Sequence, residues 1–186
     1  MSLFAARRPA RSEYAATPFA AAIDAVAGDN VLVVMKTQMN DLCELASSIS
    51  VEQIDQSDAA DEWTIRQVFE HLADAERVFG YRILRFAAGD PTPLPGWDQD
   101  AYASSRFGLG GGFTGLIEEI GALRHANLVL LRRIEPRRWE QVGTADGQKI
   151  SVRVLAWLTA AHLQDHLRIV AARVGYSLAS PRRLEA

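Results

Sequence analysis

Two histidines, His162 and His166, lie one helical turn apart in an apolar stretch that runs from Ser151 to Tyr176. Steps of three and four residues keep side chains on one side of a helix. The predicted stripe consists of Leu155, Leu158, His162, His166, Ile169 and Arg173. A buried imidazole without a partner costs free energy. We therefore expect both rings to bind a shared partner, and a divalent metal ion is the simplest one.

A metal centre needs further ligands, and the chain has two other histidines, His71 and His125. On a helical wheel, His71 lies about 100° from the centre of an apolar stripe, where its side chain can reach a neighbouring helix. That stripe consists of Ile65, Val68, Phe69, Leu72, Ala75, Glu76, Phe79, Ile83 and Phe86. His125 points away from the apolar face of its own segment, so we predict that it is a surface residue.

Apolar periodicity and end signals predict an all-α fold of four helices, at about residues 30–48, 64–88, 114–134 and 151–176. Thr64 to Gln67 matches a capping box, and Gly89-Asp90-Pro91 ends the second helix. The pair Asp146-Gly147 could turn a small hairpin before the fourth helix. A long connection, residues 89–113, joins the second and third helices.

The connection and the histidines predict the same topology. His71 lies about 10 Å from the start of its helix, and His166 lies about 12 Å from the end of its own. The two rings therefore reach one height only if the second and fourth helices are antiparallel. A long crossover at 89–113 gives that arrangement, an up-down-down-up four-helix bundle.

Length and composition set further limits. With 186 residues and a net charge of −3, we expect one domain at 30–186, an N-terminal arm at 1–29 packed on it, and no nucleic-acid partner. No apolar run is long enough for a membrane span, and one cysteine suits the cytoplasm. We expect Cys43 to be an inert core residue. Exposed helix faces make a homodimer plausible.

Several segments together resemble the DinB-like superfamily, in the branch of YfiT-like metal-dependent hydrolases and bacillithiol transferases. They are Trp63 to Glu76, the run GDPTPLPGWDQDAYA, Ser151 to Ala156, and His162-Leu-Gln-Asp-His166. The resemblance covers the chain from about Asp29 onward and implies an up-down-down-up bundle with three metal ligands, His71, His162 and His166. Leu163 and Asp165 depart from the H-E-x-H-H pattern of many relatives.

Three neutral imidazoles leave a metal ion an open coordination position. With the resemblance, this implies a hydrolase that activates water or a transferase that activates a low-molecular-weight thiol, each acting on a small-molecule substrate. The donor set allows Zn, Ni or Fe. Two alternatives are a non-catalytic, stress-associated metal-binding bundle and histidines that only pair with one another by hydrogen bonds.

Two carboxylates are candidate catalytic groups. Glu76 lies in the apolar stripe of its helix, where it would act as a base or form an ion pair with an arginine such as Arg124, and we favour the ion pair. Asp165 flanks the histidine stripe. Asn127 would either line the site or bridge helices.

Aromatic residues are the remaining candidates for a role at the site. Trp97 and Tyr102, in the long connection, would either shape a substrate mouth or close the end of the bundle, and we favour the closure. Trp63 and Trp157 are predicted to be packing residues.

Overall fold

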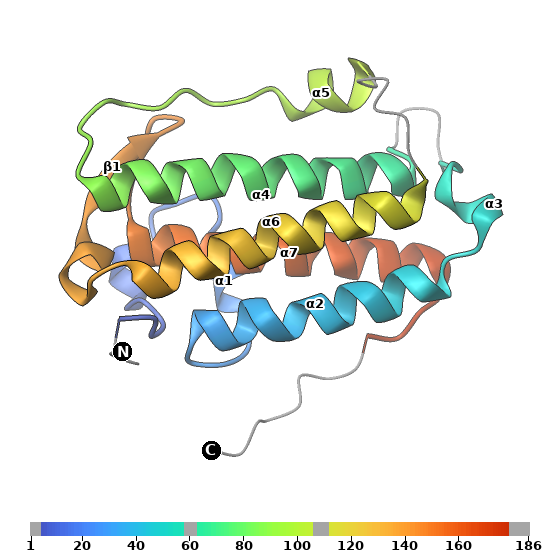
Figure 1. The fold of residues 1–186 in the computed structure, drawn as a ribbon, viewed down its shortest axis with the longest axis horizontal. Coiled ribbons are helices and arrows are strands. Elements are labelled where there is room, and N and C mark those ends of the chain that lie inside the picture. The colour runs from blue at the N-terminus through green and yellow to red at the C-terminus, as the bar shows by residue number, and fades with distance from the viewer. Residues whose placement is uncertain (1–4, 58–62, 106–111, 179–186) are drawn as a thin grey trace.

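The computed structural model describes residues 5–57, 63–105 and 112–178. Four long helices form a bundle: α2 (Val31–Ser48), α4 (Ile65–Ala88), α6 (Phe113–Arg133) and α7 (Val152–Val174) (Figure 1). Each agrees within two residues with a helix predicted from the sequence. The all-α fold class is confirmed.

Local sequence explains where these helices begin and end. The Thr64 hydroxyl accepts a hydrogen bond from the Gln67 backbone N–H at 3.1 Å, and the Gln67 side chain accepts from the Thr64 N–H at 2.8 Å. This capping box satisfies donors that the first turn of α4 leaves free. Gly89 (φ 79°) and Gly175 (φ 69°) end α4 and α7 in the left-handed region, which glycine adopts without steric cost.

The helices have the predicted up-down-down-up order. In Figure 1, α2 and α7 run in one direction, whereas α4 and α6 run in the other. Helix α4 packs against both α6 and α7, so its contact with α7 is antiparallel. This is the orientation that brings His71 to the height of the histidines on α7.

The crossover follows α4 along the outside of the bundle (Figure 1) and carries the short helix α5 (Gln99–Ser105). Two side chains of α4 hold it: Gln67 donates to the Ala103 carbonyl at 2.8 Å, and Arg82 donates to the Pro95 carbonyl at 3.0 Å. These bonds fix the segment that contains Trp97. The end of the predicted connection, residues 106–111, lies outside the described residues.

The predicted hairpin is present between α6 and α7. Strand β1 (Val142–Ala145) pairs antiparallel with β2 (Gln148–Ser151). Asp146 (φ 50°) and Gly147 (φ 71°) form the two-residue turn, which needs positive φ at both positions. The 3₁₀ helix η2 (Pro136–Glu140) precedes it.

The N-terminal segment packs on α7. It contains the 3₁₀ helix η1 (Arg11–Glu13) and helix α1 (Ala20–Asp24). A further short helix, α3 (Val51–Ile54), lies outside this segment and follows α2. The buried Trp157 side chain donates to the Arg7 carbonyl at 3.0 Å, and the Arg8 guanidinium lies 4.2 Å from its ring centre. Trp157 is therefore a packing residue, as predicted.

The core has two apolar halves with a polar layer between them. One half includes Met35, Phe79, Leu128 and Trp157, and the other includes Leu42, Phe69, Ile120 and Leu167. Polar side chains occupy the level between the halves on every long helix: Gln38, His71, Glu76, Arg124, Asn127 and His162.

Two predictions about single side chains are wrong. Cys43 is exposed and not a core residue, because it lies on the outer face of α2. Ile169 is 46% exposed, so the buried stripe of α7 does not continue through it. No helix within the described ranges is long and apolar enough to cross a membrane.

Candidate metal centre

Three of the four histidines meet in the interior of the bundle. His71 comes from the second turn of α4, and His162 and His166 come from successive turns of α7. One ring nitrogen from each residue can be chosen so that all three lie within 4.8 Å of one another. The Nε2 atoms of His71 and His162 are 2.9 Å apart. His125 is exposed on α6, as predicted.

The three rings are neutral near pH 7. Burial lowers the pKa of His71 to about 4, and the nearby His166 adds to this effect, because protonated forms of the two rings would repel each other. Burial is also the main cause that lowers the pKa of His162, followed by His166, His71 and Arg124. The pKa of His166 is lowered by burial and partly restored by Asp165. Neutral rings keep the nitrogen lone pairs that bind metal ions.

The arrangement fits a divalent metal ion. Metal–nitrogen bonds of about 2.0–2.1 Å in tetrahedral geometry place ligand nitrogens about 3.3 Å apart, which lies within the spread of distances in the cluster. Within the described residues, the buried Nδ1 atom of His71 has no hydrogen-bond partner. The Nε2 atoms of His71 and His162 can share only one proton between them. Each neutral ring carries one proton and therefore keeps one nitrogen lone pair that a metal ion can bind.

Aromatic side chains surround the histidines. The Trp97 ring stacks on His71 with centroids 5.3 Å apart and planes at 6°, and Trp63 meets His71 edge-on at 5.0 Å. Phe79 meets His162 edge-on at 5.4 Å. Trp63 packs against the apolar core, as predicted. It also contacts His71, as Trp97 does, and Tyr102 packs edge-on against Trp97. Neither contact with His71 was predicted from the sequence.

Glu76 forms the ion pair that the sequence favoured. Its side chain is 3% exposed, and its Oε1 atom lies 2.6 Å from Arg124 Nη2. Asn127 donates one hydrogen bond to Glu76 Oε2 at 2.8 Å and another to the Glu76 carbonyl at 2.9 Å. Asn127 therefore bridges α6 and α4. Asp165, the second candidate carboxylate, is exposed.

Gln38 extends this network to the remaining two helices, and sequence reasoning missed it. Its amide donates to the Ala160 carbonyl of α7 at 2.8 Å, and its Oε1 accepts from Arg124 Nη1 at 3.4 Å. A signal was available, because Gln38 lies between Met35 and Leu42 in the apolar stripe of α2. A polar residue in such a position requires a buried partner.

The fold and the site together define the class of protein: an up-down-down-up four-helix bundle whose interior holds a cluster of three neutral histidines. The chain belongs to the DinB superfamily, whose sequence profile matches residues 35–170, a range that contains the three histidines. No curated protein sequence matches the chain.

Among solved structures, the fold is similar to that of YfiT from Bacillus subtilis. The TM-score is 0.67 at 19% sequence identity, over 79% of this chain and 87% of that one. YfiT is described as a probable metal-dependent hydrolase with an unusual four-helix bundle topology. At this identity the likeness concerns the fold.

Proposed function

We propose that the protein is a metal-dependent hydrolase that binds one divalent ion, Zn, Ni or Fe, between His71, His162 and His166. The observation that carries the proposal is the convergence of three neutral imidazoles, one buried (His71) and two half-buried (His162 and His166), in the interior of the bundle. Membership of the DinB superfamily and the description of YfiT support it. When bound, such an ion supplies Lewis acidity, which polarises a carbonyl or lowers the pKa of water.

The chain's own residues would hold and shield the reacting groups. Trp63, Phe79 and Trp97 surround the rings with apolar surface, which limits the access of bulk water and strengthens electrostatic interactions. This environment suits a small substrate with an apolar part beside its reacting bond.

The two candidate carboxylates would have different roles. Both oxygens of Glu76 are engaged, by Arg124 and Asn127, so we assign Glu76 a positioning role. Arg124, which it holds, lowers the pKa of His162. Asp165 is exposed beside His166 and is the candidate to pass a proton to solvent. We expect Asp165→Asn to lower the rate about 100-fold or more with unchanged metal content.

A thiol transferase is the second candidate. Within the described residues, no carboxylate forms a hydrogen bond or ion pair with the three rings, and thiol transfer does not need a carboxylate base. In such a reaction a low-molecular-weight thiol forms a C–S bond with an electrophile. The bond from that carbon to its leaving group breaks, the leaving group takes the electron pair, and the thiol proton passes to solvent.

One experiment tests both candidates. The chelator-stripped protein is loaded with Zn²⁺, Ni²⁺ or Fe²⁺ and assayed on nitrophenyl esters, and separately on 1-chloro-2,4-dinitrobenzene with cysteine or glutathione as the thiol. We expect metal-dependent ester hydrolysis. Thiol-dependent chloride release without hydrolysis would select the transferase instead.

Variants of the histidines provide the matched test. We expect His71→Ala, His162→Ala and His166→Ala each to weaken metal binding by more than about 100-fold, a loss greater than that from removing an outer partner of a metal ligand. His125→Ala, the exposed histidine of α6, should bind metal like the parent. Full metal binding with no activity in either assay would support the non-catalytic alternative. A cytoplasmic location and a homodimer also remain predictions.

A further inference from the structure

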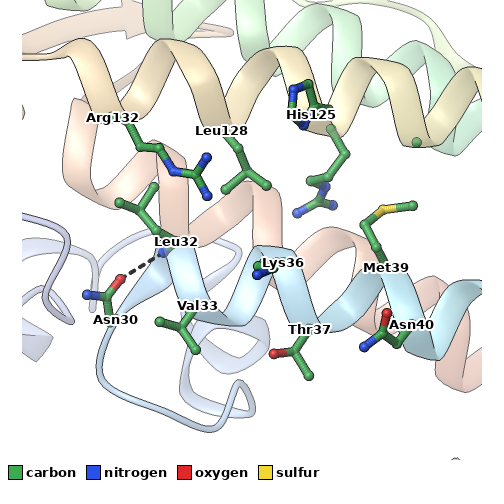
Figure 2. A pocket seen from close by; sticks show the side chains of 12 residues that line it. Asn30, Leu32, Val33, Lys36, Thr37, Met39, Asn40, His125, Leu128 and Arg132 are labelled. Atoms are coloured by element: carbon green, nitrogen blue, oxygen red, sulfur yellow. Dashed lines mark hydrogen bonds between the residues drawn. The ribbon is translucent and has the colours of Figure 1, made fainter.

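A groove of about 690 Å³ lies between α2 and α6. Figure 2 shows its walls, with Leu32 and Met39 pointing from α2 towards α6, and Leu128 and Arg132 pointing from α6 towards α2. Its lining comprises Asn30, Leu32, Val33, Lys36, Thr37, Met39, Asn40, Gly121, Arg124, His125, Leu128 and Arg132. All of these residues are described, and none belongs to the histidine cluster.

Aliphatic side chains form part of the lining of the groove. Leu32, Met39 and Leu128 supply aliphatic surface from both helices. Gly121 contributes no side chain, although a Cβ atom there would come no closer than 3.6 Å to Met39 Cε. Close helix packing therefore does not require this glycine, and its effect is to leave space at the Met39 end.

The charged groups of the groove are all cationic. Lys36 and Arg132 are both exposed, and the lining contains no carboxylate. Within the described ranges, neither Lys36 nor Arg132 forms an ion pair. Arg124 does not add to the free charge, because Glu76 pairs with it. An aliphatic wall beside two unpaired cations is complementary to a molecule with an apolar chain and an anionic head.

We propose that this groove binds an amphipathic carboxylate, meaning an aliphatic chain that ends in one carboxylate group. The chain would lie against Leu32, Met39 and Leu128, and the carboxylate would interact with Lys36 and Arg132, since guanidinium groups bind carboxylates through paired hydrogen bonds. The volume is within the range of about 300–1,000 Å³ that is typical of small-molecule sites. This site is separate from the metal centre and does not depend on the proposed hydrolase activity.

Decanoate is the probe that tests the proposal. The full-length protein is titrated with decanoate while amide chemical shifts are followed by NMR, with decyltrimethylammonium and butyrate as comparators. We expect saturable shifts centred on α2 and α6, and binding of decanoate at least about 10-fold tighter than that of either comparator. Equal binding of decanoate and the cation, shifts centred elsewhere, or no saturation in the millimolar range would overturn the proposal.

Charge variants separate this groove from general surface attraction. We expect the double variant Lys36→Gln/Arg132→Gln to bind decanoate at least about 10-fold more weakly. The single variant Arg132→Gln should also weaken binding, whereas Arg133→Gln, which removes one positive charge from the exposed neighbouring position, should change the affinity less than 2-fold. Equal losses in these two single variants would contradict the proposal.

Filling the groove tests its apolar part. Gly121→Leu should abolish saturable binding, with circular dichroism to verify the helical fold. If that variant does not fold, the surface double variant still decides the question. A stable dimer that buries α2 and α6 against a second copy, and excludes decanoate, would also overturn the proposal.

Discussion

Two groups of polar side chains interrupt the core in the middle of the bundle, and they differ in whether their charged members are paired with one another. Glu76, Arg124, Asn127 and Gln38 form a network that reaches all four long helices. The three histidines make one hydrogen bond among themselves, between His71 and His162, and leave His71 Nδ1 without a partner in the described residues.

The network is not perfect, because Arg124 Nε has no hydrogen-bond partner among the described residues, and Nη2 approaches Glu76 outside hydrogen-bond geometry. Even so, its opposite charges are paired and each of its members contacts another. The histidine cluster has no pair of opposite charges of this kind. Buried charges that are paired within the protein contribute to structure, whereas three neutral rings that lie together and each keep one nitrogen lone pair are a set of metal ligands.

The first prediction, which has the largest expected effect, removes the ion pair of the polar network. Glu76→Ala leaves the Arg124 charge buried without its partner, which should lower the free energy of unfolding by about 3–5 kcal/mol. Urea denaturation of the metal-free protein measures this change. Glu118→Ala, at an exposed position on α6, is the control and should stay within about 0.5 kcal/mol of the parent. If the free energy of unfolding of Glu76→Ala fell no further than that of the control, the ion pair would not organise the core.

The fold was accessible from the sequence because its signals are local. Apolar periodicity predicts the long helices, and the Thr64 capping box and Gly89 mark the two ends of α4. The topology followed from the height of His71 and the length of the crossover. The histidine cluster was accessible for the same reason, since three ligands on two regular helices depend only on helix geometry.

Contacts between distant segments could not be obtained in this way. The stacking of Trp97 on His71 depends on the path of the crossover. This segment is irregular, so its sequence has no apolar periodicity from which the path could be predicted. The exposure of Cys43 depends on how far α2 is rotated about its axis against α6 and α7. Apolar periodicity fixes such a rotation only roughly.

A second prediction concerns the close contact that allows Asn127 to reach Glu76. A Cβ atom at Gly80 would clash with the Asn127 side-chain oxygen, so Gly80→Ala should displace Asn127 and cost about 1–3 kcal/mol. Gly121→Ala is the matched control on α6, where the added methyl meets only Met39 at 3.6 Å. There the usual helix preference should stabilise the protein by about 0.5–1 kcal/mol. Opposite signs in thermal melts are expected, and equal signs would contradict this account of the network.

A third prediction concerns the pH dependence of the free energy of unfolding, which the lowered pKa of His71 should affect. The pKa of His71 is about 4 in the folded protein and about 6.5 in an unfolded chain. Between these values the unfolded chain binds a proton that the folded protein does not, so stability is lost as pH falls from about 6.5 towards 4. The slope should be about 1 kcal/mol per pH unit for each such histidine.

Metal-free parent and His71→Leu proteins, compared by urea denaturation at pH 7, 6 and 5, isolate this contribution. The variant should show a shallower pH dependence. Identical slopes would mean that His71 is not held neutral in the folded protein.

The smallest expected effect is the stability change when a histidine of the cluster is removed without metal. His162→Leu keeps an apolar side chain in the core and removes one hydrogen bond to His71. The free energy of unfolding of the metal-free protein should change by less than about 1 kcal/mol, while metal binding is lost. A loss above about 3 kcal/mol would instead support histidines that serve only as hydrogen-bonded core residues.

The most direct measurement of the central claim is a crystal structure of the metal-loaded protein, with anomalous scattering recorded at the absorption edge of the added ion. We predict one strong anomalous peak within about 2.0–2.3 Å of a ring nitrogen from each of His71, His162 and His166. The network of Glu76 and Arg124 should show no peak. A fully loaded crystal without a peak among the three histidines, or with its ion bound elsewhere, would contradict the account.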